Sequence, residues 1–233
     1  MHAQQMVPLH GLCGYAPGQI AAYSNGSHST FTNKRHYEQH YFMGYKWQCV
    51  EFARRWLLHR KGLVLPQYDF AAHFVYLRKV HDIHTGTAVP CQFVPQGAEE
   101  PPQADSLIVY PGTSENIVGH VGVITHVASD SVGVADQNRF FHYWGERSCS
   151  AEFPLECVGG RYYIRDPEVE CRGWIAFPEC PNLPEGESLS VEPYMRGPQS
   201  LGLCQRLSYI IGQFWSCCIG RESTTYCLHK GRQ

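Results

Sequence analysis

One cysteine of this chain has neighbours that favour nucleophilic chemistry. Cys49 lies in residues 45–55, YKWQCVEFARR, where Val50, Ala53 and Leu57 have the i, i+3, i+7 spacing of one buried helix face. The pattern predicts a loop that leads into an amphipathic helix, with Cys49 in the first turn. Unpaired backbone N–H groups and the helix dipole stabilise a thiolate there, which is the reactive form of cysteine. Since a lone cysteine on a helix is usually a small core residue, a nucleophile requires a base elsewhere.

Two later segments supply a candidate base and a candidate carboxylate. His120 lies in residues 119–125, GHVGVIT, and Asp136 ends residues 132–136, VGVAD. Both segments are rich in β-branched residues and punctuated by glycine, which predicts strands, and residues 129–131 suit a hairpin turn between them. Cys49, His120 and Asp136 therefore fit a nucleophile, a general base and a carboxylate that orients the imidazole, in that chain order.

The geometry of the hairpin is a difficulty for this assignment. With a simple tight turn, Asp136 would lie three or four residues along the ladder from His120, roughly 10–13 Å away. A β-bulge, a strong twist or a shifted register is needed to bring the two side chains together. The alternative interpretation of Asp136, as a plain carboxylate at a strand end, stays open at this point.

Four separated motifs, in this order, resemble one known family. They are GYAPG at residues 14–18, KWQCVEFAR at 46–54, GHV at 119–121 and ADQN at 135–138. The resemblance is to the amidase domain of the glutathionylspermidine synthetase/amidase and trypanothione synthetase family. This domain is a member of the cysteine–histidine-dependent amidohydrolase/peptidase (CHAP) group. The resemblance extends from about Gly11 to about Pro178.

The resemblance implies a fold and an activity. The fold is an α+β, papain-like one, in which an N-terminal helix with the nucleophile packs on an antiparallel β-sheet. The activity is that of a cysteine amidohydrolase, which cleaves the glycyl–spermidine amide of glutathionylspermidine, or the amide of trypanothione, without a cofactor or metal. The family roles imply that Cys49 is the nucleophile, His120 the base and Asp136 the third member, which is glutamate in some relatives.

Three further residues become candidates for substrate binding. Arg54 matches a family arginine and would hold the glutathionyl group, although it also suits a surface charge on the helix. Gln48 resembles the oxyanion-hole glutamine of papain-type enzymes, a role that backbone N–H groups can also fill. Asn138 either forms a hydrogen bond near the site or ends its strand.

Composition limits the class of protein. At 233 residues, the chain suits one domain plus an appendage, and a hydrophobic content of 43% excludes general disorder. The formal charge of −2 offers no basic surface for nucleic acid. We find neither an apolar segment of signal-peptide length near the N-terminus nor one that could span a membrane, and expect a cytoplasmic protein without a membrane partner. The oligomeric state is not predicted.

The domain organisation follows from a change of character near residue 180. Residues 1–180 are expected to form the CHAP amidase domain, and residues 181–233 a proline-containing linker and a cysteine-rich tail of unknown function. Because no glycine-rich phosphate loop is present, no ligase activity is expected. Two other functions stay open: a peptidoglycan-type CHAP endopeptidase, and an inactive truncated domain with a binding or regulatory role.

The remaining patterns are weaker. The tail holds Cys204, Cys217, Cys218, Cys227 and His229, but adjacent cysteines do not match zinc-site spacing. Residues 81–84, HDIH, are interpreted as a polar loop and not as a metal site. Helices are predicted at residues 49–60 and 70–80, the second with Phe70, Phe74 and Leu77 on one face. A Pro/Gly-containing connection is predicted at 85–105, and strands at 106–110, 161–164 and 172–177. The function of an apolar stretch at 201–214 is not predicted.

Overall fold

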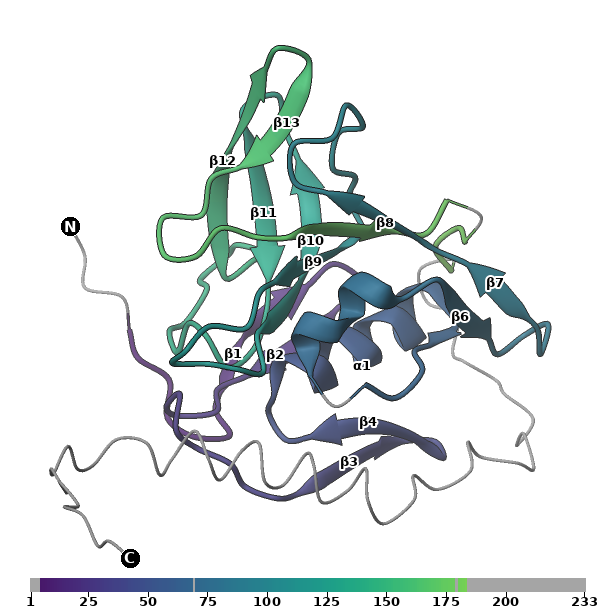
Figure 1. Cartoon of the computed structure of the whole chain (residues 1–233). Helices are drawn as coiled ribbons and strands as arrows, with labels where there is room; N and C mark the ends of the chain where they lie inside the picture. The colour runs from purple at the N-terminus through teal and green to yellow at the C-terminus, as the bar shows by residue number, and fades with distance from the viewer. Residues whose placement is uncertain (1–4, 69, 179, 184–233) are drawn as a thin grey trace, which may run out of the picture.

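The computed structural model describes residues 5–68, 70–178 and 180–183. Its elements (Figure 1) are, in chain order, β1 (Leu12–Ala16), β2 (Ile20–Tyr23), β3 (Arg35–Glu38), β4 (Tyr41–Tyr45), α1 (Cys49–Lys61), β5 (Leu63–Val64), the 3₁₀ helix η1 (Ala71–Tyr76), β6 (Lys79–Asp82), β7 (Ala88–Pro90), β8 (Gln92–Pro95), β9 (Leu107–Tyr110), β10 (His120–Val127), β11 (Ser131–Ala135), β12 (Ala151–Val158), β13 (Arg161–Ile164) and β14 (Gly173–Ala176).

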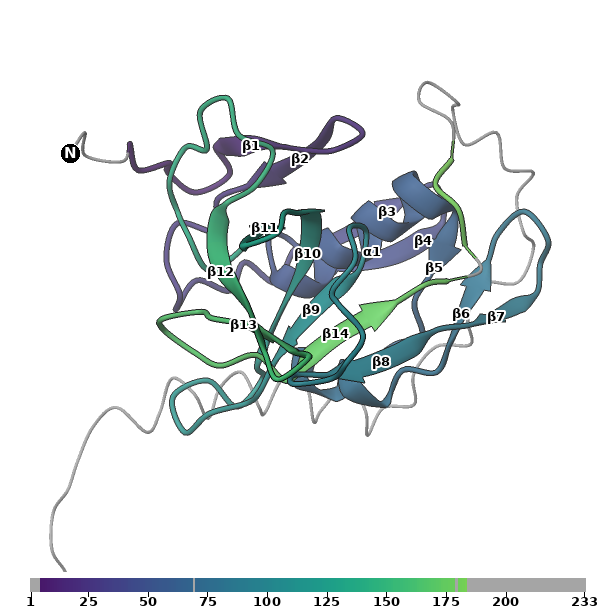
Figure 2. The same ribbon diagram turned by 90° about the horizontal axis from the view of Figure 1, so that it is seen from above.

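The largest sheet carries the second half of the domain. Within the described residues it has seven strands in the order β13-β12-β11-β10-β9-β14-β8, and its strand pairs are antiparallel. Helix α1 lies between this sheet and the β3–β4 hairpin, as Figures 1 and 2 show, and contacts both β10 and β4. The α+β fold is therefore the papain-like arrangement expected from the motifs.

The sheet separates two hydrophobic clusters. Val121 and Val123 of β10 pack in the same cluster as Phe52 and Trp56 of α1. Ile124, on the opposite face of β10, belongs to the second cluster, with core residues of β9, β11 and β12. Alternate residues of one strand thus enter different cores, as the two-residue repeat of a β-strand requires.

Helix α1 agrees closely with the sequence-based expectation. Gln48 precedes it in an extended conformation, and Gly62 ends it at φ 64°, a left-handed conformation that glycine adopts without steric cost. The Gly62 N–H donates to the carbonyl of Leu58, as in a common C-terminal cap. Ala53 and Leu57 are fully buried, so the predicted apolar face is confirmed.

The second predicted helix, at residues 70–80, was wrong in type and length. The structure has a 3₁₀ helix at Ala71–Tyr76, followed by strand β6. The buried residues Ala71, Phe74 and Leu77 recur every three residues, which matches the 3₁₀ repeat better than the α-helical one. Of the predicted stripe, Phe74 and Leu77 are confirmed, but Phe70 is only half-buried and Ala71 is buried instead. The period was assigned to the wrong helix type.

The connection predicted at residues 85–105 was also wrong, because it contains β7 and β8. Strand β8 pairs with β14 at the edge of the large sheet. Its terminal Pro95 is tolerated there, since an edge strand needs fewer backbone donors. The predicted polar loop at residues 81–84 begins as the end of β6 and continues into a turn, in which Asp82 Oδ1 accepts from the His84 N–H.

Several expectations concern the C-terminal part. The strands predicted at 106–110, 161–164 and 172–177 are present as β9, β13 and β14. The tail cysteines, His229 and the apolar stretch at 201–214 lie outside the described residues. In the part of the chain that the structure describes, no helix combines the length and apolar character that a bilayer crossing requires.

Candidate active site

The thiol of Cys49 meets the imidazole of His120. Cys49 is the first residue of α1, and its side chain forms a hydrogen bond with that of His120, the first residue of β10. Cys49 is largely buried, with 6% of the residue exposed. The first-turn position also places the thiol beside backbone N–H groups that have no partner within the helix.

A carboxylate lies on the other side of the imidazole. His120 Nε2 is 2.8 Å from Asp136 Oδ2, and the Asp136 side chain is completely buried. The Ser150 hydroxyl lies 2.8 Å from Asp136 Oδ1 and equally close to the Val134 carbonyl, which already accepts from the Ser150 N–H. Because a carboxylate is the stronger acceptor, the hydroxyl proton is best placed on Asp136. No local pattern around Ser150 had indicated this contact.

A β-bulge resolves the distance problem of the hairpin. His126 pairs with Gly133, but Ile124 pairs with Val134, so Thr125 is an extra residue in β10. Continued to the end of β11, the shifted register places Asp136 opposite Gly122, two residues from His120 and on the same face. Without the bulge Asp136 would lie opposite Val123, on the other face, because a one-residue shift reverses side-chain direction.

The surroundings of His120 favour its charged form. Burial disfavours the imidazolium, but the Cys49 sulfur and the Asp136 carboxylate outweigh burial and raise the pKa of His120 to about 9. At neutral pH the imidazole is therefore protonated next to the thiol. Such a pair is the reactive combination of cysteine hydrolases, in which the cation stabilises the thiolate.

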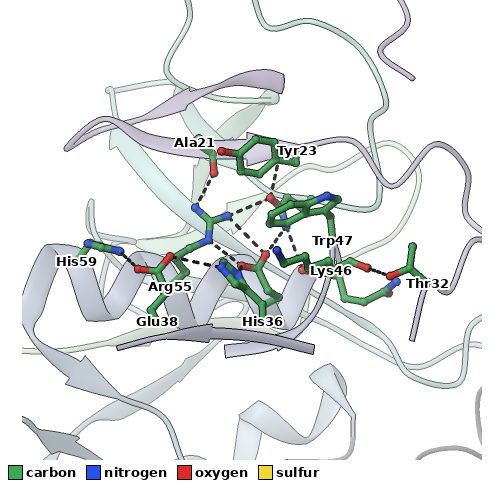
Figure 3. Close-up of polar contacts among 12 residues, drawn as sticks. Ala21, Tyr23, Thr32, His36, Glu38, Lys46, Trp47, Arg55 and His59 are labelled. Atoms are coloured by element: carbon green, nitrogen blue, oxygen red, sulfur yellow. Dashed lines mark hydrogen bonds and ion pairs between the residues drawn. The ribbon is translucent and has the colours of Figure 1, made fainter. Parts of the chain in front are cut away.

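A buried polar network fixes α1 relative to the end of β11 (Figure 3). Glu51, which has no exposed surface, accepts from Arg55 Nε at 2.7 Å and from Gln137 Nε2 at 2.7 Å. The ring nitrogen of His36 lies 2.7 Å from the same carboxylate. Burial raises the pKa of Glu51, but His36 and Arg55 outweigh it, and the net shift is downward. The network connects the residue after Asp136 to the helix that begins at Cys49.

Gln48 and Asn138, both predicted site residues, contact each other. The Asn138 Nδ2 donates to Gln48 Oε1 at 2.7 Å, and Asn138 Oδ1 accepts from Asn25 Nδ2 at 3.0 Å. The Gln48 amide also donates to the Thr30 carbonyl at 3.3 Å. The side chain of Gln48 is thus engaged in positioning, so the backbone N–H of Cys49 is the better candidate for an oxyanion donor.

Arg54 lies apart from this group. It is buried and donates from Nη2 to the Pro66 carbonyl at 3.0 Å, so its interpretation as a surface charge was wrong. This bond ties α1 to the segment that follows β5. The role of Arg54 in substrate binding stays a prediction.

A cavity of about 170 Å³ lies beside His120. His120, Asn138, Arg139 and Glu168 are among the residues that line it. Arg139 forms ion pairs with Asp166 at 2.7 Å and with Glu168 at 3.0 Å. The cavity therefore presents the Arg139 guanidinium and the Glu168 carboxylate next to the imidazole, a setting suited to a ligand with charges of both signs.

Comparison with known proteins agrees with this geometry. Residues 40–138 match the family described as the CHAP domain, a segment that includes Cys49, His120 and Asp136. This chain carries a CHAP domain. Its N-terminal region is homologous to trypanothione synthetase of Crithidia fasciculata, with 47% identity over 185 residues. The alignment covers 77% of this chain and 28% of that relative.

A second relative is bifunctional glutathionylspermidine synthetase/amidase of Escherichia coli (strain K12). It is 34% identical over 182 residues, which are 73% of this chain and 29% of the relative. The chain thus spans less than a third of the length of these curated relatives. The CHAP domain is homologous to the amidase part of the bifunctional enzyme and is consistent with a cysteine amidase or hydrolase.

Proposed function

We propose that this protein is a cysteine amidohydrolase that cleaves the amide between the glycine of a glutathionyl group and a polyamine amine. The observation that carries the proposal is the chain of contacts from the Cys49 thiol through His120 to the buried Asp136 carboxylate. The mixed charges of the adjacent cavity suit a conjugate that has carboxylates at one end and ammonium groups at the other. The relative named as an amidase supports the same choice.

The first half of the reaction forms a thioester. The Cys49 sulfur attacks the glycyl carbonyl, and the oxyanion is stabilised by the Cys49 backbone N–H at the helix N-terminus. His120, protonated by virtue of its raised pKa, then donates its proton to the departing polyamine nitrogen as the carbon–nitrogen bond breaks. Asp136 holds the imidazole through Nε2, which leaves Nδ1 for the thiol and the leaving group.

The second half releases the acid. The now neutral imidazole of His120 removes a proton from water, and the hydroxide attacks the thioester carbonyl. The carbon–sulfur bond breaks and the thiolate–imidazolium pair is restored. The acid that is released loses its own proton to solvent, so glutathione leaves as a carboxylate. Each step uses side chains of this chain, and Asn138 and Gln48 hold the loop beside the nucleophile.

Substrate panels test the proposal. The full chain and its Cys49→Ala variant are incubated with glutathionylspermidine, trypanothione and a muropeptide, while the release of free amine is followed. We expect polyamine release that is lost in Cys49→Ala and retained in Cys157→Ala, because Cys157 is an exposed thiol on β12.

The other outcomes identify the alternatives. Cleavage of the muropeptide alone would indicate a peptidoglycan endopeptidase and overturn the choice of substrate. No turnover of any substrate by the folded protein would indicate a binding or regulatory domain. A cytoplasmic location stays a prediction.

A further inference from the structure

A second group of cysteine, histidine and carboxylate side chains lies away from Cys49. Of the residues that the structure describes, His126, Cys149 and Glu152 form the one group whose ligand-type atoms all lie within 4.8 Å of one another. His126 is in β10, Glu152 in β12, and Cys149 in the loop just before β12. The proposed hydrolysis uses none of the three.

The side chains of His126 and Glu152 meet because the residue between them in the sheet is a glycine. Gly133 of β11 pairs with His126 on one side and with Glu152 on the other, so His126, Gly133 and Glu152 form one row across the sheet. A Cβ atom at Gly133 would overlap His126 Cε1, which means that the imidazole occupies the space of the missing side chain. His126 Nε2 thereby reaches Glu152 Oε1 at 3.2 Å, across two strand spacings.

The hydrogen bonds of His126 engage Nδ1 and leave Nε2 as the nitrogen that could bind a metal. The Thr125 hydroxyl donates to the Gly133 carbonyl at 3.2 Å and lies 3.2 Å from His126 Nδ1. Because its proton is used by the carbonyl, the hydroxyl accepts from Nδ1–H. Nε2, which faces Glu152, is then the nitrogen that would coordinate a metal after loss of its proton, because metal-bound histidines hold an outer partner through the other N–H.

We propose that His126, Cys149 and Glu152 bind a divalent transition-metal ion of the zinc class. Thiolate, imidazole and carboxylate are all zinc ligands, whereas magnesium and calcium prefer oxygen ligands only. In a tetrahedral site with bonds of about 2.0–2.3 Å, ligand atoms lie roughly 3.3–3.8 Å apart, so the group must contract by about 1 Å. The side chains of His126 and Glu152 are 43% and 52% exposed and can make that adjustment.

Metal binding would release the Cys149 proton and would link two strands of the sheet. The Cys149 thiol releases its proton to solvent as the metal–sulfur bond forms, and water completes the fourth position. The metal would join the end of β10 to the start of β12, directly beside Ser150, whose hydroxyl contacts Asp136. Binding to the folded state alone would also raise the melting temperature.

The test uses the full chain with Cys49→Ala, which removes the catalytic thiol as a competing ligand. Zn²⁺ per chain is measured after dialysis, and Co²⁺ is used as a spectroscopic probe of thiolate coordination. We expect Cys149→Ser to lose about one equivalent of zinc and the thiolate-to-cobalt absorption. His126→Ala and Gly133→Ala should weaken Co²⁺ binding at least about tenfold, the latter because its methyl displaces the imidazole.

Matched variants decide the outcome. Cys157→Ser, which removes an exposed thiol on the same strand as Glu152, should bind metal and shift its melting temperature like the parent. Cysteines beyond residue 183 are shared by every variant and cancel in the comparison. Should Cys149→Ser misfold, His126→Ala carries the test, because its side chain lies at the surface. Equal metal binding by the parent and by folded His126→Ala would overturn the proposal, and would leave His126–Glu152 as a simple ion pair.

Discussion

The two ends of strand β10 carry similar side chains in different settings. At its start, His120 contacts Cys49 and Asp136, and at its far end His126 lies near Cys149 and Glu152. A glycine of the β10–β11 hairpin lies close to one member of each group. Gly122 lies beside Asp136 in the first, and Gly133 lies under the His126 ring in the second.

The difference between the groups is one of burial and thiol environment. Asp136 has no exposed side-chain surface, whereas Glu152 is half exposed and therefore screened by water. Cys49 lies at a helix N-terminus, but Cys149 lies in a loop, where burial and then the Glu152 charge raise its pKa to about 11. The same three residue types thus favour a nucleophile at Cys49. At Cys149 they favour a protonated thiol, which is the proposed metal ligand.

The largest expected effect separates the two cysteines. Cys49→Ser should reduce polyamine release at least about 10³-fold, because a serine hydroxyl beside an imidazolium is a poor nucleophile. Cys149→Ser should cost far less, under about tenfold, since its effect reaches Asp136 only through Ser150. Steady-state assays of both variants measure the contrast. Similar losses in the two would show that the groups are not functionally distinct.

The second-largest effect is expected when the charge of the buried Asp136 carboxylate is removed. Asp136→Asn should lower kcat roughly 10²–10⁴-fold, because the imidazole loses the partner that fixes its tautomer and favours its charge. Asp130→Asn, in the exposed turn of the same hairpin, is the matched control and should retain activity. Unchanged kcat in Asp136→Asn would remove this carboxylate from the mechanism.

The pH dependence should report on His120. Its pKa is raised from 6.5 to about 9, so the charged imidazolium is fully formed below 6.5 and is lost as pH rises through about 9. Both kcat/KM and the stability contribution of this group should therefore decline on the alkaline side, near pH 9. A pH profile of Asp136→Asn should show that decline at lower pH. An alkaline limb that does not move would assign it to another group.

The smallest effect concerns the outer contact of Asp136. Ser150→Ala removes a buried hydroxyl next to a charged acceptor, which should cost about 1–3 kcal/mol of stability. We expect kcat to fall roughly two- to tenfold, with the alkaline limb shifted, because Asp136 is then held less firmly. Denaturant unfolding and pH profiles measure the two effects. Ser131→Ala, in β11, is the control, and a stability loss without any kinetic change would limit Ser150 to a structural role.

Local patterns in the chain were sufficient for much of the fold. The apolar spacing around Cys49 and the glycine at position 62 predicted α1 correctly, and β-branched runs predicted β9, β10 and β11. Strands β7 and β8 escaped prediction because short strands have little periodicity. Strand β12 was also missed, although it has eight residues and lies inside the sheet. The stripe at Phe74 and Leu77 was assigned to an α-helix because periods of 3.0 and 3.6 are hard to distinguish over two turns.

The candidate site, too, could be predicted only in part from the sequence. The residue types and chain order of Cys49, His120 and Asp136 were enough to nominate them. Counting residues in the hairpin showed that a bulge, a strong twist or a shifted register was needed. The structure contains a bulge at Thr125. Ser150, Asn25 and Gln137 were not recognised as site residues, since a polar residue that is buried by distant partners looks like any surface polar residue in one dimension.

The amino-acid sequence by itself therefore determined the helix, most central strands and the three chemical groups, because these depend on neighbours a few residues apart. Tertiary structure decided which of those groups meet. The one-residue shift at Thr125 selects the face on which Asp136 lies, and the packing of α1 on β10 brings Cys49 to His120. Such choices depend on contacts between segments tens of residues apart, whose energies no local pattern encodes.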